Sequence, residues 1–113
     1  NFNVFTEWDE TSFCRQRNEN LKTIEDWIIQ HNTQLQASTS LTPILIIDDI
    51  MYLRSMRRKI YVMTRNNSLP LLVVWIKTTL ETALIRNNLR IGRAKISIDT
   101  IMKINEALQP PDK

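Results

Sequence analysis

Two adjacent carboxylates, Asp48 and Asp49, are the residues of this chain best placed to do chemistry, because they follow directly on an apolar run. Carboxylates of this kind can hold a metal ion or a substrate hydroxyl. A guanidinium can hold phosphate oxygens through its planar fork of donors. Three arginines follow closely in the sequence: Arg54, Arg57 and Arg58. The pattern therefore predicts a site where acidic side chains bind a metal ion and basic side chains bind phosphate.

The element that must position these carboxylates is the run from Pro43 to Ile47, which is continuous, apolar and rich in β-branched residues. Such a run predicts a strand buried on both faces of a parallel sheet. A second run, Leu69–Ile76, has a proline near its start, where a missing N–H is tolerated, and predicts another interior strand. Ligands of open α/β sheets bind beyond the carboxyl ends of the strands, so we expect Asp48 and Asp49 in that crevice.

Apolar residues at helical spacing predict four helices around these strands. They run from Asn20 to about Leu35, from Leu53 to the turn residues Asn66–Ser68, from Leu80 to Gly92 and from Ser97 to Pro110. Residues 1–18 show no sustained period and are predicted to be irregular. Helices that alternate with strands imply an α/β fold with a parallel sheet and right-handed crossovers.

Length and composition limit the classes of protein that remain. The chain has 113 residues, of which 42% are hydrophobic and 24% charged, the profile of one soluble globular domain. A net charge of +3 permits a nucleic-acid partner without requiring one. A single cysteine, Cys14, favours a reducing, cytoplasmic compartment, and no apolar run is long enough to span a membrane. Neither Cys14 nor His31 has partners at metal-ligand spacing.

The single glycine, Gly92, excludes a phosphate-binding loop within these residues. A loop of the G-x-x-x-x-G-K-[ST] type needs glycines so that backbone N–H groups can converge on the phosphates. We therefore expect the chain to be a fragment whose first strand, phosphate loop and first helix lie upstream of Asn1. The alternative is a protein that never bound nucleotide through such a loop.

Several short motifs together resemble phosphoseryl-tRNA kinase, the enzyme that phosphorylates serine on selenocysteine tRNA. They span roughly the C-terminal two-thirds of the chain: Leu45-Ile46-Ile47-Asp48-Asp49, Tyr52, Ser55-Met56-Arg57, Tyr61, Ser68-Leu69, Leu80-Glu81-Thr82, Arg86-Asn87 and Arg90. The resemblance implies a three-layer P-loop kinase-like parallel sheet that is incomplete, with only central strands and flanking helices present. Residues 1–113 would form part of a kinase domain, with an irregular lead-in over 1–19, a core with a lid helix over 20–96, and a C-terminal helix and tail over 97–113.

The resemblance also assigns roles around the acidic pair. Asp48 and Asp49 would hold Mg²⁺ and help to order the acceptor hydroxyl. Arg57, which matches the arginine of the Ser-Met-Arg motif, would position the substrate or the acidic pair, and Arg54 would bind the substrate. Ile50 departs from the family pattern, which usually has a small polar residue after the acidic pair. A hydrogen-bonding role at that position is therefore not expected here.

Arg86 and Arg90 match the R-x-x-x-R lid signature of this group of kinases. Four residues apart on one helix, they would share a face, clamp the phosphates of ATP and neutralise charge that builds up during transfer. The implied reaction moves the γ-phosphate of ATP to the seryl group of an aminoacylated tRNA, seryl-tRNA(Sec). The fragment alone is expected not to turn over ATP.

Two other interpretations stay open at this point. The chain could belong to the Elongator-associated, KTI12-like tRNA-modification ATPases, which are related to the kinase and share a similar core. It could also be a non-enzymatic α/β module whose basic helices bind RNA or a protein partner. That module would bind RNA in a salt-sensitive way without any dependence on ATP.

Overall fold

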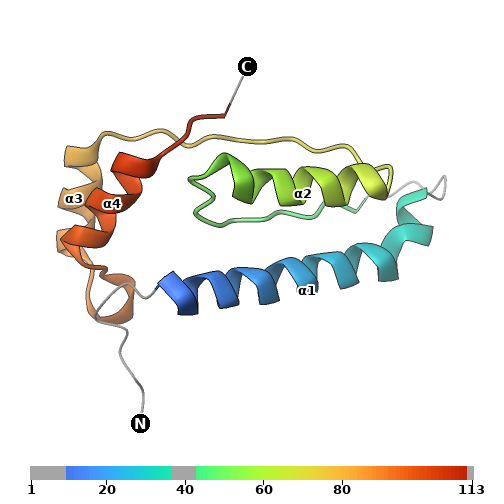
Figure 1. Cartoon of the computed structure of the whole chain (residues 1–113), viewed down its shortest axis with the longest axis horizontal. Helices are drawn as coiled ribbons and strands as arrows, with labels where there is room; N and C mark the ends of the chain where they lie inside the picture. Colours follow the sequence, from blue (N-terminus) through green and yellow to red (C-terminus); the bar gives the residue numbers. More distant parts are fainter. Residues whose placement is uncertain (1–9, 37–42, 112–113) are drawn as a thin grey trace, which may run out of the picture.

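The computed structural model describes residues 10–36 and 43–111. Its elements are α1 (Glu10–Gln36), α2 (Arg54–Asn66), α3 (Leu80–Leu89), the short 3₁₀ helix η1 (Gly92–Ala94) and α4 (Ile98–Ala107). Two long loops, the acidic loop (residues 43–52) and the apolar loop (residues 69–79), run along the length of α2 (Figure 1). In this view the acidic loop lies between α1 and α2, and α3 and α4 close one end of the molecule.

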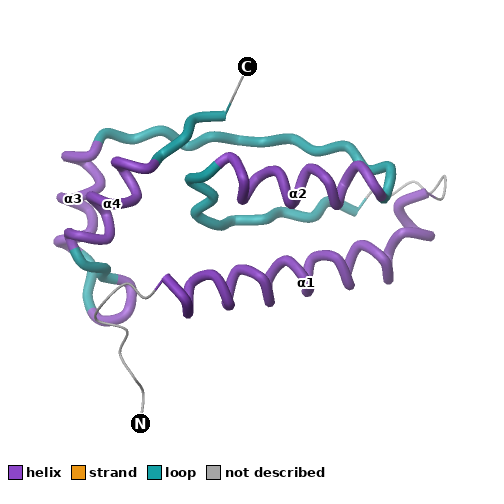
Figure 2. The backbone as a smooth tube through the Cα atoms, viewed as in Figure 1, coloured by secondary structure: helices purple, strands orange, loops and turns teal. Residues whose placement is uncertain are grey.

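The predicted parallel sheet is wrong, because the described residues contain helices and loops but no strand (Figure 2). A strand requires a ladder of hydrogen bonds to a neighbour. The two loops run on either side of α2 in Figure 1, and no backbone hydrogen bond joins them within the described residues. Their apolar side chains consequently face solvent: Ile44, Leu72 and Ile76 are 81%, 85% and 87% exposed. A helical fold therefore replaces the expected incomplete, three-layer P-loop kinase-like α/β fold.

The first helix is longer than the sequence pattern predicts. α1 begins at Glu10, whereas the pattern predicts a helix from Asn20 and irregular structure over 1–18. Residues 1–9 lie outside the described residues. The first half of α1 lacks an apolar period, but its Glu, Arg and Gln residues are good helix formers. Its second half does carry the predicted apolar face, on which Ile28 is buried.

α2 confirms its predicted end at the turn Asn66–Ser68. Ser68 has a backbone φ of +56°, a left-handed conformation that is common just after a helix. The N–H of Leu69 donates to the carbonyl of Thr64 over 2.9 Å and completes the turn. Thr64 and Ile60 are buried, which fixes the inner face of α2.

The starts of α3 and α4 are each capped by a hydroxyl side chain. The hydroxyl of Thr79 accepts from the N–H of Thr82 over 3.1 Å, and the hydroxyl of Ser97 accepts from the N–H of Thr100 over 3.2 Å. α3 ends at Leu89, before the predicted boundary at Gly92; this glycine has a φ of +64° and begins η1. α3 and α4 pack against each other and form a small unit of their own.

The molecule is open and has a small core. Its radius of gyration is 16.9 Å, whereas a compact domain of this length has one of about 13 Å. Among the described residues, Ile28 and Ile60 are the buried hydrophobic side chains. Polar contacts between segments therefore carry much of the tertiary structure. None of the described helices is long and apolar enough to cross a membrane.

Candidate metal and phosphate site

A groove of about 300 Å³ lies between α1 and the acidic loop and contains both predicted carboxylates. It is lined by Arg17, Asn20, Leu21, Thr23 and Ile24 of α1 and by Leu45, Ile46, Ile47, Asp48, Asp49 and Met51 of the acidic loop. One wall is therefore a helix face, and the other is the segment that delivers the acidic pair. The groove joins two parts of the chain that are distant in sequence.

Arg17 links the two walls of this groove. It is only 6% exposed. Its Nη2 donates to the carbonyl of Ile50 over 2.8 Å, and its Nη1 lies 3.4 Å from Oδ2 of Asp49. A buried charge is costly unless it is both paired and hydrogen-bonded. Arg17 is paired with Asp49 and hydrogen-bonded through Nη2, whereas its buried Nε and Nη1 make no hydrogen bond within the part of the chain that the structure describes. It therefore links the acidic loop to α1 and balances the charge of one of the two carboxylates.

The two carboxylates differ in what they contact. Asp49 accepts a hydrogen bond at Oδ1 from the N–H of Ile50 over 2.8 Å, and its other oxygen faces Arg17. Asp48 is exposed, and its side chain makes no hydrogen bond or ion pair with any described residue. An ionised carboxylate is an acceptor only. Asp48 therefore keeps both oxygens for a cation or for a donor group of a ligand.

Arg57 points its guanidinium at backbone carbonyls. Its Nη1 donates to Met51 over 2.8 Å and its Nη2 donates to Gln109 over 2.7 Å. The N–H of Gln109 in turn donates to the carbonyl of Tyr52 over 2.8 Å, and its Oε1 accepts from the N–H of Arg54 over 2.7 Å. These bonds, the Gln109 clasp, tie the segment after α4 to the start of α2. The substrate role of Arg57 stays a prediction, and two of its donor nitrogens are engaged here.

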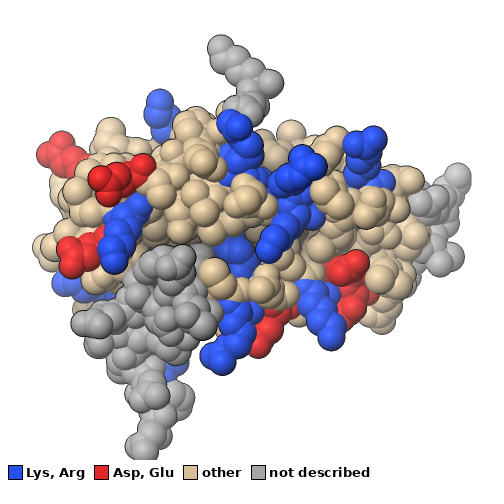
Figure 3. Space-filling view, in the orientation of Figure 1, with Lys and Arg blue, Asp and Glu red and all other residues tan. Residues whose placement is uncertain are grey.

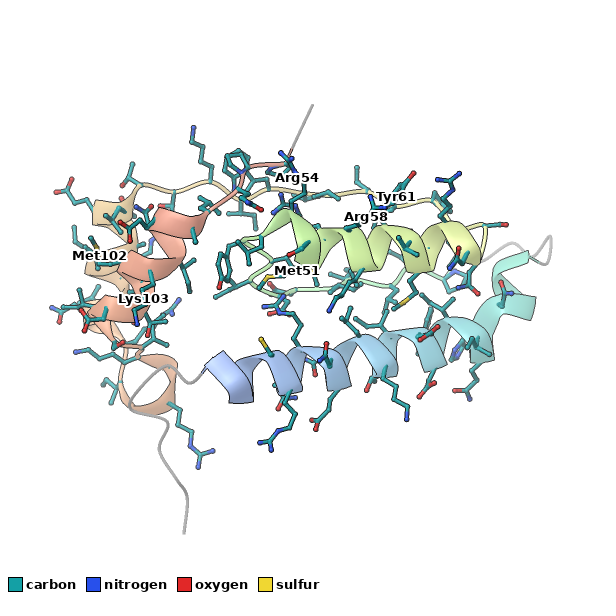
Figure 4. The ribbon with its side chains drawn as sticks, viewed as in Figure 1. Met51, Arg54, Arg58, Tyr61, Met102 and Lys103 are labelled. Carbon is teal, nitrogen blue, oxygen red and sulfur yellow. The ribbon has the colours of Figure 1, made fainter. Side chains whose placement is uncertain are left out.

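Arg54 and Arg58 are exposed residues of α2. Figure 4 shows both side chains on α2, with Met51 on the acidic loop before the helix begins. Neither arginine lines the groove that contains the acidic pair. The substrate role of Arg54 therefore also stays a prediction.

The two arginines of the lid motif do not share a helix face. Arg86 lies in the last turn of α3, whereas Arg90 follows the helix in an extended conformation with φ −77° and ψ 153°. Nη1 of Arg90 donates to the carbonyl of Ala94 over 3.4 Å, and Arg86 is exposed. Neither residue lines the groove that contains Asp48 and Asp49. The structure does not bring these arginines to the carboxylates, and their lid role stays a prediction.

Asn87, which follows the first arginine of the lid motif, is the buried residue of α3. It is 3% exposed, and its Nδ2 donates to the carbonyl of Ile96 over 2.7 Å. Its Oδ1 accepts from the N–H of the same Ile96 over 3.0 Å. This two-point contact, the Asn87 clamp, holds the connection between α3 and α4. The motif thus contains a residue with a structural role.

Sequence reasoning missed Arg17 and Asn87, although each leaves a signal. Arg17 precedes Leu21 by one helical turn on the stripe that continues to Ile28, so it is a charged residue on an apolar face. Asparagine is a weak helix former whose side chain seeks backbone partners, so Asn87 within a helix points to such a contact. Gln109 carries no comparable signal, because its partners are remote in sequence.

The described residues contain no group of three or more His, Cys, Asp or Glu side chains that could enclose a metal ion. Mg²⁺ needs no such group, because it usually keeps several waters and binds one or two carboxylates together with substrate phosphates. The acidic pair fits that smaller ligand set. Figure 3 shows Lys and Arg side chains spread over the visible face with Asp and Glu between them, so this face has a mixed charge.

Comparison with known proteins identifies a matching family. The sequence model of the family described as "Chromatin associated protein KTI12" matches residues 5–113. None of the curated proteins or solved structures that were compared with the chain matches it. The family match includes α1, the acidic loop, the lid motif and the Gln109 clasp.

Proposed function

Since the chain belongs to the KTI12 family, we propose that it is part of an ATPase that works with the Elongator complex in tRNA modification. The family is P-loop ATPase-like and associated with tRNA. Of the interpretations drawn from the sequence, this one agrees with the family match, whereas phosphorylation of seryl-tRNA(Sec) has no specific support from it. The match over residues 5–113 is the observation that carries the proposal.

In this proposal the groove between α1 and the acidic loop is the metal side of the ATP site. Asp48 supports this because it is exposed and its carboxylate makes no hydrogen bond or ion pair with the described residues. A bound Mg²⁺ would neutralise charge on the β- and γ-phosphates of ATP. Asp48 would hold the cation, and Asp49 would keep the loop in place beside it.

The chain has a single glycine, which limits how these residues can bind the phosphates of ATP. Gly92 lies in η1, remote in sequence from the acidic pair, and cannot form a phosphate-binding loop by itself. Within the proposed site these residues therefore supply carboxylates and guanidinium groups rather than converging backbone N–H groups. The positive net charge of +3 supports tRNA as the partner, since phosphate contacts dominate nucleic-acid affinity.

The test is ATP hydrolysis by the protein as its gene encodes it. We expect phosphate release that requires Mg²⁺ and increases with tRNA. Asp48→Asn should lower the rate by roughly a hundredfold or more, because a metal ion contributes several kcal/mol to charge stabilisation. Asp26→Asn is the matched control, since Asp26 is an exposed carboxylate of α1 that does not line the groove.

Radiolabelled γ-phosphate distinguishes the alternatives. Label released as inorganic phosphate supports the ATPase. Label transferred to seryl-tRNA(Sec) would instead establish the kinase. Salt-sensitive RNA binding without any nucleotide dependence would identify a non-enzymatic RNA-binding module. Equal rates for Asp48→Asn and the unmodified protein would remove Asp48 from the site.

A further inference from the structure

We infer that Arg17 is a positioning residue that reserves Asp48 for the cation by holding Asp49 in an ion pair. The inference rests on the proposed function, because it concerns the same acidic site and divides the work between its two carboxylates. Three observations carry it: the burial of Arg17, the different contacts of the two aspartates, and the position of all three residues on one groove.

The forked guanidinium fixes the loop at two points. Nη2 of Arg17 holds the carbonyl of Ile50 at 2.8 Å while Nη1 faces Oδ2 of Asp49 at 3.4 Å. Oδ1 of Asp49 already accepts from the N–H of Ile50 at 2.8 Å. Both oxygens of Asp49 are therefore engaged, and the backbone after it cannot rotate without breaking one of these contacts. The neighbouring Asp48 is held at the surface of the groove as a result.

The charges of the three residues also indicate that Asp49 pairs with Arg17 and that Asp48 stays available to the cation. Two neighbouring carboxylates repel each other, and a guanidinium beside one of them cancels that charge locally. A single available carboxylate suits Mg²⁺, which must keep coordination positions for phosphate oxygens and water. A second free carboxylate would bind a cation more tightly and would occupy one of those positions. Arg17 thus keeps the affinity of the site for the cation low and its coordination open.

The test measures binding of Mn²⁺ alone to the full protein by the loss of the free-ion EPR signal. Arg17→Met keeps an unbranched aliphatic stem but removes the positive charge, so Asp49 loses its ion pair. We expect Mn²⁺ to bind roughly five- to twentyfold more tightly, the effect of removing one unit of positive charge near a divalent ion in a solvated groove. A purely structural role predicts the opposite, because a disordered loop loses affinity.

Three further variants isolate the cause. Arg17→Lys keeps the charge and should bind Mn²⁺ like the unmodified protein. The double variant Arg17→Met with Asp49→Asn removes both charges of the pair and should return the affinity to its original value. Asp48→Asn should weaken Mn²⁺ binding at least tenfold. Circular dichroism of each variant verifies that α1 and the remaining helices are formed.

Unchanged or weaker Mn²⁺ binding by folded Arg17→Met would overturn the inference. Mn²⁺ binding by Asp48→Asn as tight as in the unmodified protein would also overturn the inference. The measurement requires no nucleotide, so its outcome is separate from that of the ATPase assay. A protein that binds Mn²⁺ as expected but does not hydrolyse ATP would contradict the proposed function and leave the role of Arg17 standing as a property of the cation site.

Discussion

The α3–α4 unit and the contact between α1 and the acidic loop are both held by polar side chains, but over very different lengths of chain. Asn87 bonds to Ile96, nine positions away. Arg17 bonds to Ile50, 33 positions away. Closing the longer loop costs about 1 kcal/mol more in chain entropy. The α3–α4 unit is therefore a local structure, whereas the groove depends on the tertiary fold.

This difference indicates which parts should open first. The α3–α4 unit has two capped helices and a buried clamp, so its hydrogen bonds reinforce one another within a short stretch. The groove depends on one buried arginine, and the apolar side chains of the acidic loop are largely exposed. Local unfolding starts where few apolar contacts are buried. We therefore expect the acidic loop to exchange its amide hydrogens before α3 and α4 do.

The largest expected effect comes from removing the Asn87 clamp. Asn87→Leu leaves the N–H and the carbonyl of Ile96 without their partner, at a cost of about 3 kcal/mol in the stability of the α3–α4 unit. Hydrogen exchange at the amide of Ile96 measures this directly. The acidic loop should be unaffected, since the clamp is local. An Ile96 amide as protected as in the unmodified protein would show that the clamp contributes nothing.

Asn87→Asp separates the two halves of the clamp. The carboxylate still accepts from the N–H of Ile96 but is repelled by its carbonyl, so the unit should be destabilised at neutral pH. At acidic pH the introduced carboxyl is protonated and regains a donor. Protection of the Ile96 amide should therefore rise as the pH falls. An effect that does not depend on pH would mean that the donor half of the clamp is unimportant.

A second, smaller effect is expected at the Gln109 clasp, which also joins segments remote in sequence. Arg57→Met removes the hydrogen bonds to Met51 and Gln109 and should lower the free energy of unfolding by about 2 kcal/mol. Urea denaturation measures the loss. Arg58→Met is the matched control on the same helix, and an exposed substitution of this kind should change stability by less than about 0.5 kcal/mol. An equal loss of unfolding free energy in Arg57→Met and Arg58→Met would show that the Gln109 clasp does not stabilise the protein.

How much of this structure follows from the sequence depends on the range of the interactions. The caps at Thr79 and Ser97, the turn Asn66–Ser68 and the break at Gly92 were predictable, because each depends on residues within one helical turn. The Asn87 clamp could have been suspected from an asparagine within a helix. The Gln109 clasp could not, since its partners meet only in the folded chain.

The two apolar runs were predicted to be strands, but they are loops. Residues 43–47 and 69–76 have the composition of buried strands, yet composition records only what a segment could bury and not whether a partner is beside it. The two loops lie on either side of α2, and no backbone hydrogen bond joins them among the described residues. At the candidate site, Asp48 and Asp49 line a groove, and the arginine that contacts Asp49 is Arg17 rather than an arginine of α2. Their metal-binding role stays a prediction.

The smallest expected effect comes from removing the helix caps, which tests whether α3 and α4 unfold together as one unit. Ser97→Ala removes the side chain that caps α4 and should cost about 1 kcal/mol, and Thr79→Ala should cost about the same at the start of α3. If the two helices form one unit, each substitution lowers amide protection in both helices. Ser97→Thr keeps the hydroxyl and should restore most of the loss. Protection lost only in the substituted helix would show that α3 and α4 fold independently, and that the Asn87 clamp joins them without making them cooperative.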